Sequence, residues 1–458
     1  MKNKASFKAL PLLTAVVLLA SACSNTPTGE CRTVARRLSA AQVEQRNLIE
    51  PQEEAEELPE NTLVYRNKDG GRTVYMFSSP LSDTAENTEI TENGSCLTQG
   101  NICDRFLPPV LSHQSAILLN APDTHVSVYP ERESSHNAVM GERENIFGRK
   151  EMAATYVDVF GKGVDYICWP TAFGINTEIV LRKRPETNTF RIRVELPNLV
   201  ADTGSPDYIL FKTALENGAA SAMLYTPLAA DSGKKGAAAW SYKNTVRLID
   251  KDSGTGAYTV EYTIDEAFLQ DKKTKYPVRL NQSIHLYKSK QPDTSAYSGT
   301  GDEAGHYLSP YMLLGDSTIK GEGWTYVRFE TLKDLEIDPE KIVSATYTVR
   351  NLFTSSREVT IGAYAVTADW CSINTRWFNR PSQDEAPVAQ TIIREQGDVS
   401  LDMTTLVREM LRNRKYTDAK YSVQNSFLIR CDTPGGNLLF ASGDNGLYSP
   451  VLEIVVAD

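Results

Sequence analysis

The stretch NTFRIRVEL, residues 188–196, alternates between apolar and charged residues. Its apolar positions are Phe190, Ile192, Val194 and Leu196, and the residues between them are two arginines and a glutamate. Side chains of a β-strand point alternately to its two faces, so one face of this segment is apolar and the other is charged. This pattern predicts a strand that buries one face in a core.

The same alternation recurs along the chain, in WTYVRFETL (324–332), VSATYTVRN (343–351), EVTIGAYAV (358–366) and VLEIVVAD (451–458). KDSGTG (251–256) lies between two more such segments and predicts a hairpin. Helical spacing of apolar residues is clear mainly in LDMTTLVREMLRN (401–413), where Asp402 is a candidate N-cap. We therefore predict an all-β protein with short helices, built from β-sandwiches.

Composition predicts four parts of the chain. Residues 1–22 form a signal segment, and residues 23–58, which end in the glutamate-rich EPQEEAEELPE, form an acidic flexible tether. Residues 59–288 form a β-rich N-terminal region, and residues 289–458 form a C-terminal β-sandwich. A chain of 458 residues with 41% hydrophobic content has enough material for more than one core.

The charge balance limits the class of partner. The formal net charge is −10 and the pI is about 5.3. Nucleic acids and anionic lipid surfaces attract basic faces, so we expect neither as a partner.

Seven cysteines are too few for a disulfide-built scaffold of this size. Cys96 and Cys103 flank a short polar loop and are a candidate disulfide that would close it. The other cysteines within the folded regions are equally well explained as small buried hydrophobic residues.

The N-terminus contains LLASACSN, residues 18–25, in which small residues precede Cys23. A lysine-containing segment and a short apolar run come before it, as in a secretory signal. The stretch resembles the bacterial lipobox, which implies that the Cys23 thiol is acylated and becomes the mature N-terminus. The protein would then be extracytoplasmic, bound to the membrane by a lipid and exposed at the cell surface. The alternative is a secreted protein in which this cysteine occurs by chance.

Motifs of catalysis and metal binding are absent from the sequence. It contains no G-x-S-x-G, no H-E-x-x-H and no Walker A loop, and its five histidines lie far apart. We therefore predict no catalytic residue, no metal site and no cofactor, and expect that the protein is not an enzyme.

The region around residues 340–458 resembles the DNRLRE domain, also classed as carbohydrate-binding module family 96. The matching pieces occur in the family's order: YVRFETL, KIVSATYTV, VTADW with TRWFNRP, LDMTTLVREML and the closing FLIRCDTPGGNLLFASGDNGLYSPVLEIVV. The segment from Asp293 to Asp316 is expected to open the domain. The resemblance implies a jelly-roll-like sandwich that binds polysaccharide.

TLVYRNKDGGRTVYMFSSPLS (62–82), ATYVDVFGKGVDYICW (154–169) and IDEAFLQDKKTKYPVRL (264–280) resemble the region before such domains in large bacterial surface proteins with Rhs-type or YD repeats. No YD repeats follow in this chain. The resemblance implies a β-rich, extracellular, non-catalytic unit, and the toxin-delivery role of those proteins does not transfer.

Two groups of aromatic residues are candidates for sugar stacking. The loop SAYSGTGDEAGHYLSPYM (295–312) is the better surface candidate, with Tyr297, His306, Tyr307 and Tyr311 as candidate ligand-binding residues. The alternative interpretation is that this loop only connects two domains. Trp370 and Trp377 are better explained as core residues of the sandwich.

These inferences support a lipid-anchored surface protein whose C-terminal sandwich binds polysaccharide or mediates adhesion. The basic clusters lie outside the tyrosine-rich loop, which favours a neutral or weakly charged glycan over the alginate-like ligands that the family suggests. One alternative is a purely structural surface protein, and another is an extracellular glycan hydrolase or lyase. A concave face lined by aromatic residues would favour binding, and convergent carboxylates in a cleft would favour an enzyme.

Overall fold

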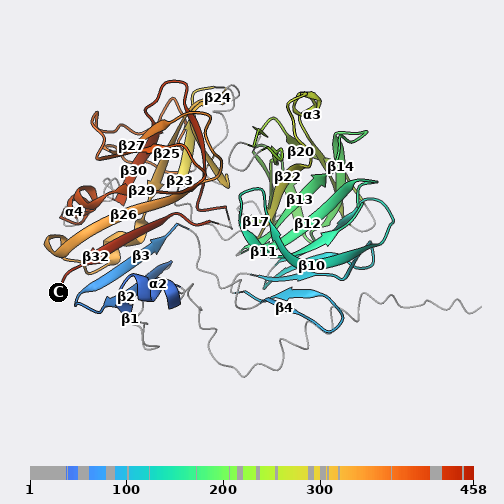
Figure 1. The fold of residues 1–458 in the computed structure, drawn as a ribbon, viewed down its shortest axis with the longest axis horizontal. Coiled ribbons are helices and arrows are strands. Elements are labelled where there is room, and N and C mark those ends of the chain that lie inside the picture. Colours follow the sequence, from blue (N-terminus) through green and yellow to red (C-terminus); the bar gives the residue numbers. More distant parts are fainter. Residues whose placement is uncertain are drawn as a thin grey trace, which may run out of the picture.

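The computed structural model describes residues 38, 40–49, 61–78, 88–100, 103–122, 124–171, 173–205, 207–213, 220–233, 238–252, 256–286, 293–299, 306, 309–317, 320–372, 374–412, 425–445 and 448–458. These residues form two β-rich lobes (Figure 1). We call residues 88–286 the central lobe. Residues 38–78 together with 293–458 are the terminal lobe, because they include both ends of the described chain. None of the described helices is long and apolar enough to cross a membrane.

The central lobe contains two antiparallel sheets. One sheet has the order β15-β16-β17-β22-β13-β12-β11-β10-β7, with β18 and β19 beside β22, and the other has the order β20-β21-β14-β9-β8-β6-β5-β4. Its elements are β4 (Thr88–Ile90), β5 (Cys96–Thr98), β6 (Asp104–Leu107), β7 (Val110–Leu111), β8 (Ile117–Ala121), β9 (Thr124–Pro130), β10 (His136–Glu144), β11 (Lys150–Tyr156), β12 (Val164–Thr171), β13 (Gly174–Leu181), β14 (Thr189–Glu195), β15 (Leu199–Asp202), β16 (Tyr208–Thr213), β17 (Ala220–Tyr225), β18 (Leu228–Ala230), β19 (Trp240–Ser241), β20 (Thr245–Lys251), β21 (Tyr258–Thr263), α3 (Glu266–Gln270) and β22 (Val278–His285).

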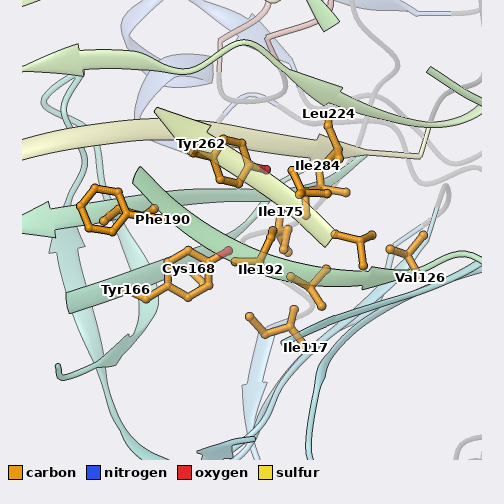
Figure 2. Close-up of a cluster of buried hydrophobic side chains, with 14 of the residues drawn as sticks. Ile117, Val126, Tyr166, Cys168, Ile175, Phe190, Ile192, Leu224, Tyr262 and Ile284 are labelled. Atoms are coloured by element: carbon orange, nitrogen blue, oxygen red, sulfur yellow. The ribbon is translucent and has the colours of Figure 1, made fainter. Parts of the chain in front are cut away.

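The apolar faces of these two sheets meet in one core (Figure 2). Phe190 and Ile192 of β14 contribute from one sheet, and Ile175 of β13 and Ile284 of β22 contribute from the other. The alternation of residues 188–196 therefore buries one face of a strand as predicted, and β20 and β21 pair antiparallel as the predicted hairpin requires.

The terminal lobe is a second sandwich. Its elements are α2 (Ala40–Gln45), β1 (Leu48–Ile49), β2 (Thr62–Asn67), β3 (Arg72–Phe77), β23 (Asp293–Tyr297), β24 (Tyr311–Ser317), β25 (Gly321–Arg328), the 3-10 helices η1 (Glu330–Asp334) and η2 (Pro339–Lys341), β26 (Ile342–Asn351), β27 (Val359–Ala365), β28 (Ala389–Ile393), β29 (Gly397–Asp402), α4 (Thr404–Arg412), β30 (Ser426–Cys431), β31 (Asn437–Ala441) and β32 (Val451–Val456). One layer has the order β1-β2-β3-β32-β26 with β29 on β26, and the other has the order β31-β24-β25-β30-β27-β28 with β23 on β25. A single pair, Asn351 with Phe440, links the layers through β26 and β31. The all-β sandwich prediction is confirmed for both lobes.

Two chain segments differ from the predicted boundaries. β2 and β3 lie within the predicted N-terminal region 59–288, but β3 pairs along its length with β32, the last strand. The predicted tether of residues 23–58 contains α2 and β1, and Val43 and Leu48 from these elements pack against Tyr65 and Tyr75. The acidic composition concealed these few apolar side chains, so at least residues 40–49 belong to the folded lobe.

The predicted helix at residues 401–413 is α4. It buries Leu406, Val407, Met410 and Leu411. The Met403 carbonyl accepts the first bond of the helix, from the Val407 N–H, so Met403 and not Asp402 occupies the N-cap position. The Asp402 carboxylate, one residue earlier, accepts a hydrogen bond of 3.0 Å from the Thr404 backbone N–H and so satisfies a donor at the helix start.

Candidate functional site

A hollow of about 540 Å³ lies on the outer face of the layer that contains β25, β30, β27 and β28. Its lining residues come from these strands, from β24 beside β25, and from the turn after β30. They are Gly315, Asp316, Glu322, Tyr364, Gln390, Arg430, Cys431, Asp432, Thr433, Pro434 and Gly435. Most of these residues carry hydrogen-bonding groups, so the hollow is a polar surface.

One line of residues crosses this face from strand to strand. The registers pair Trp324 with Arg430, Arg430 with Gly362, and Gly362 with Gln390. The neighbours of these residues, Ile361 among them, point into the core of the sandwich. Because side chains alternate along a strand, this line faces away from the core.

Gly362 leaves a gap in the middle of the line. A Cβ atom at this position would lie 2.5 Å from Asp432 Oδ2 and 2.6 Å from Tyr364 Cε2, both too close. The missing side chain therefore allows the Tyr364 ring and the Asp432 carboxylate to lie over the sheet at the floor of the hollow.

Asp432 is the centre of a hydrogen-bond network there. The Tyr364 hydroxyl donates to its Oδ1 at 2.7 Å, and Arg430 Nε donates to the same oxygen at 3.1 Å. Gln390 Nε2 donates to its Oδ2 at 2.9 Å. Burial and the bond to Asp432 raise the pKa of Tyr364. The network fixes four polar side chains in one arrangement at the rim and floor of the hollow.

A stack of guanidinium groups and aromatic rings continues from the network. Arg430 lies 4.1 Å from the Tyr364 ring centroid and 5.4 Å from that of Trp324. Arg380 lies 4.7 Å from the centroid of Trp324 and 4.1 Å from that of Trp377. Such cation–π contacts hold flat groups beside one another. The face therefore combines aromatic rings with hydrogen-bonding groups.

Trp370 and Trp377 belong to the chain between β27 and β28 that covers one end of this face. Trp370 is 7% exposed, and its indole Nε1 donates to Ser426 Oγ at 3.0 Å. Trp377 is only half-buried and packs against Trp324, with ring centroids 5.1 Å apart. The core assignment is confirmed for Trp370, whereas Trp377 lies at the margin of the aromatic cluster.

The charges around the hollow are mainly negative. Among its lining residues, the carboxylates are those of Asp316, Glu322 and Asp432, and Arg430 carries the single positive charge. Glu322 accepts a hydrogen bond of 2.8 Å from Trp324 Nε1, and Asp316 accepts one of 2.9 Å from the Gly435 backbone N–H. Each carboxylate is thus held in place by a neighbour.

The residues predicted for ligand binding lie elsewhere, where the two lobes meet. Tyr297 is 1% exposed and His306 is also buried, so the prediction that these rings are surface-exposed is wrong. The Tyr311 hydroxyl donates to Asn281 Oδ1 of the central lobe at 2.9 Å. Tyr307 lies outside the described residues, as does Cys23. The other interpretation of this loop, that it connects two domains, fits Tyr297, His306 and Tyr311 better than ligand binding does.

A buried charge cluster accompanies these rings. Asp207 of the central lobe contacts His306 Nδ1 through one carboxylate oxygen, and Lys320 Nζ lies 2.6 Å from the other. Lys320 also lies 4.8 Å from the Tyr297 ring centroid. Burial opposes ionisation of Asp207, but the charges of Lys320 and His306 outweigh it and hold the pKa of Asp207 well below its usual value. This cluster joins the lobes.

The hairpin of β10 and β11 supplies a second contact between the lobes. At its tip, Phe147 is buried against Tyr311 and Phe353, with ring centroids 6.0 Å away in both cases. Gln396 Nε2 of the terminal lobe donates to the Phe147 carbonyl at 2.8 Å. The buried Phe147 ring and the hydrogen bond from Gln396 together fix this hairpin against the terminal lobe.

The predicted disulfide between Cys96 and Cys103 is not formed in the structure, where both residues are free, buried cysteines. Burial raises the pKa of each thiol. Both side chains belong to the core of the central lobe, so they act there as small hydrophobic residues.

Within the described part of the chain, no group of three or more His, Cys, Asp or Glu side chains is arranged so that it could hold a metal ion.

No model of a known protein family matches the chain, and no curated protein matches it. Among solved structures, the exo-beta-1,3-galactanase of Phanerochaete chrysosporium with galactose aligns with a TM-score of 0.13 at 7% identity, covering 87% of this chain and 96% of that one. A variant of that enzyme with beta-1,3-galactotriose aligns with a TM-score of 0.11 at 9% identity and the same coverage. TM-scores this low carry no argument about fold or function.

Proposed function

We propose that the terminal lobe binds neutral or weakly charged polysaccharide in the hollow over β25, β30, β27 and β28. The observation that carries the proposal is the preformed polar network around Asp432, which adjoins the rings of Tyr364 and Trp324. Sugar hydroxyls need donors and acceptors in fixed positions, and the C–H faces of pyranose rings pack on aromatic surfaces. The resemblance to carbohydrate-binding module family 96 supports the same class of ligand.

The preference for a neutral glycan follows from charge. Three carboxylates and one guanidinium line the hollow, and the whole chain carries a formal charge of −10. An acidic polymer would bring further negative charge to this surface and would be repelled. A neutral chain can accept hydrogen bonds from Gln390 and Arg430 and donate them to Asp316 and Glu322.

Removal of exposed groups at the hollow should weaken binding without unfolding the lobe. Gln390→Ala and Asp316→Ala are each expected to lower the affinity for a neutral glycan roughly 3–10-fold, the effect of one lost hydrogen bond of about 0.5–1.5 kcal/mol. Gln42→Ala, which removes an exposed glutamine from α2 of the same lobe, is the matched control and should leave affinity unchanged. Titration calorimetry of the full ectodomain against a panel of neutral and acidic glycans measures both.

Three outcomes of this titration would change the assignment. No heat with any glycan would favour the purely structural alternative. Tight binding to acidic polymers alone would overturn the choice of ligand. New reducing ends in the glycan after incubation would favour a hydrolase, a possibility that the three carboxylates at the hollow keep open.

We also propose that Cys23 is acylated and anchors the protein at the cell surface. Cys23→Ala should remove lipid labelling and shift the protein from the membrane fraction to the medium or to an uncleaved precursor. Cys371→Ala, which removes an exposed cysteine of the folded lobe, is the matched control and should leave labelling unchanged. Palmitate labelling that persists in Cys23→Ala would contradict the anchor.

A further inference from the structure

Two buried carboxyl groups lie together at one end of the terminal-lobe sandwich. Asp293 is the first residue of β23, and Asp444 follows β31 on the way to β32. Their exposed fractions are 2% and 6%. The Gly443 backbone N–H donates to Asp293 Oδ2 at 2.8 Å, which places the loop after β31 directly against Asp293.

Nothing among the described residues neutralises this pair. No arginine, lysine or histidine there acts on either carboxyl group, and Asp444 Oδ2 has no hydrogen-bond partner. Burial raises the pKa of Asp293 to about 7, and burial together with the charge of Asp293 raises the pKa of Asp444 well above its usual value. Two adjacent carboxylates in a low-dielectric interior must bind either a proton or a cation to lose this charge.

A second buried oxygen without a hydrogen-bond partner, after Asp444 Oδ2, belongs to Tyr347. The Tyr347 hydroxyl on β26 is completely buried and has no hydrogen-bond partner. The pKa of Tyr347 is raised by burial and by the charge of Asp293, so the hydroxyl lies within the electrostatic reach of that carboxylate. A buried hydroxyl without a partner is unusual, because buried polar atoms are nearly always hydrogen-bonded.

We propose that Asp293 and Asp444 bind a calcium ion. Calcium takes oxygen ligands in a flexible geometry, and two carboxylates balance its charge of two. Magnesium requires stricter octahedral geometry and retains more water, and zinc prefers the nitrogen and sulfur ligands that this pair lacks. Backbone carbonyls or water would supply the remaining ligands, because the described residues offer only two carboxylates here.

The test uses the full chain after treatment with EDTA. Calcium at about 100 times its Kd should raise Tm by roughly 5–10 °C, and magnesium at the same concentration should raise it less. Asp293→Asn and Asp444→Asn, which keep the side-chain shape, should each weaken calcium binding at least tenfold in titration calorimetry. Asp398→Asn on β29 removes an exposed carboxylate from the same lobe and should change nothing.

Terbium luminescence of the unsubstituted protein provides a second readout, which does not depend on whether a variant folds. Terbium bound at the site should luminesce on excitation of nearby tyrosine, and calcium should displace it. A response to calcium that persists in both Asp→Asn variants would overturn the site.

If the two carboxyl groups bind only a proton, the calcium proposal is wrong. The dependence of Tm on pH distinguishes this case. A carboxyl group with a raised pKa stabilises the fold at low pH and loses this contribution as pH rises through its folded value. Tm would then fall between pH 5.5 and pH 8, and calcium would not restore it. Calcium binding predicts instead that the calcium-induced rise in Tm is larger at pH 8 than at pH 5.5.

Discussion

Asp207→Ala is expected to lower the free energy of unfolding by about 3–5 kcal/mol and to loosen the contact between the two lobes. The substitution leaves Lys320 and His306 without the carboxylate that both contact. His306 is buried and Lys320 is mostly buried, so water compensates poorly for the lost partner. Removal of one partner from a buried ion pair costs far more than removal of an exposed one.

Calorimetry of the intact chain and small-angle scattering would measure the two effects. Asp202→Ala is the matched control, because Asp202 pairs with Lys212 in the same lobe but both side chains are well exposed to water, 45% and 37% respectively. It should cost less than about 1 kcal/mol. Wild-type stability and lobe spacing in the Asp207 variant would contradict the role of this cluster.

The same cluster predicts an acid response. The folded pKa of Asp207 lies below its usual value, so its stabilising contribution is present above the unfolded pKa of about 3.9. That contribution is lost as pH falls through the folded value. The contact between the lobes should therefore weaken in strong acid and persist at neutral pH.

Trp370→Ala is expected to destabilise the terminal lobe by about 3–5 kcal/mol, as large-to-small core substitutions do. The indole packs against Tyr326 with ring centroids 5.7 Å apart, and the Arg328 guanidinium lies 4.3 Å from its ring centroid. Alanine at this position leaves a cavity and deprives Ser426 Oγ of its indole donor. Urea unfolding followed by far-ultraviolet circular dichroism measures the loss.

Phe378→Ala is the matched control in the same segment. Phe378 is 79% exposed, so its truncation should change the free energy of unfolding by less than about 0.5 kcal/mol. Equal effects of the two substitutions would show that Trp370 is not a core residue. A large effect of Trp370→Ala with unchanged glycan affinity would separate its structural role from the proposed binding face.

The strands could be predicted from sequence because each buries one face and so alternates with period two. The segments at 324–332, 343–351, 358–366 and 451–458 all contain strands. The adjacency of β3 and β32 could not be predicted, since alternation specifies a buried face and not the neighbour. The acidic N-terminal segment likewise gave no sign that Val43 and Leu48 pack on the lobe.

The candidate site was missed for a related reason. Glycine and serine around Tyr297 and Tyr311 indicate an exposed loop, yet residues of the central lobe cover both rings. Arg430 lies in β30 and Asp432 directly follows that strand, whereas Tyr364 lies on β27, so the register between β27 and β30 brings Tyr364 to the other two. The available signal was weak: polar residues occupy the outward positions of segments whose inward positions are apolar, as in Thr360 and Tyr364 on either side of Ile361 and Ala363. Only the pairing of strands turns such positions into a surface.

The pairing of β3 with β32 also determines the order in which the chain can fold. The Gly71 backbone N–H donates to the carboxylate of Asp458, 387 residues further along the chain. Contacts of such long sequence separation form slowly, because a long loop must close first. The central lobe is continuous in sequence and can fold while the chain is still emerging, whereas β3 must wait for the last strand to be made. The terminal lobe, with its proposed glycan and calcium sites, is therefore completed last, and a chain truncated before β32 would leave β3 as an exposed edge open to aggregation.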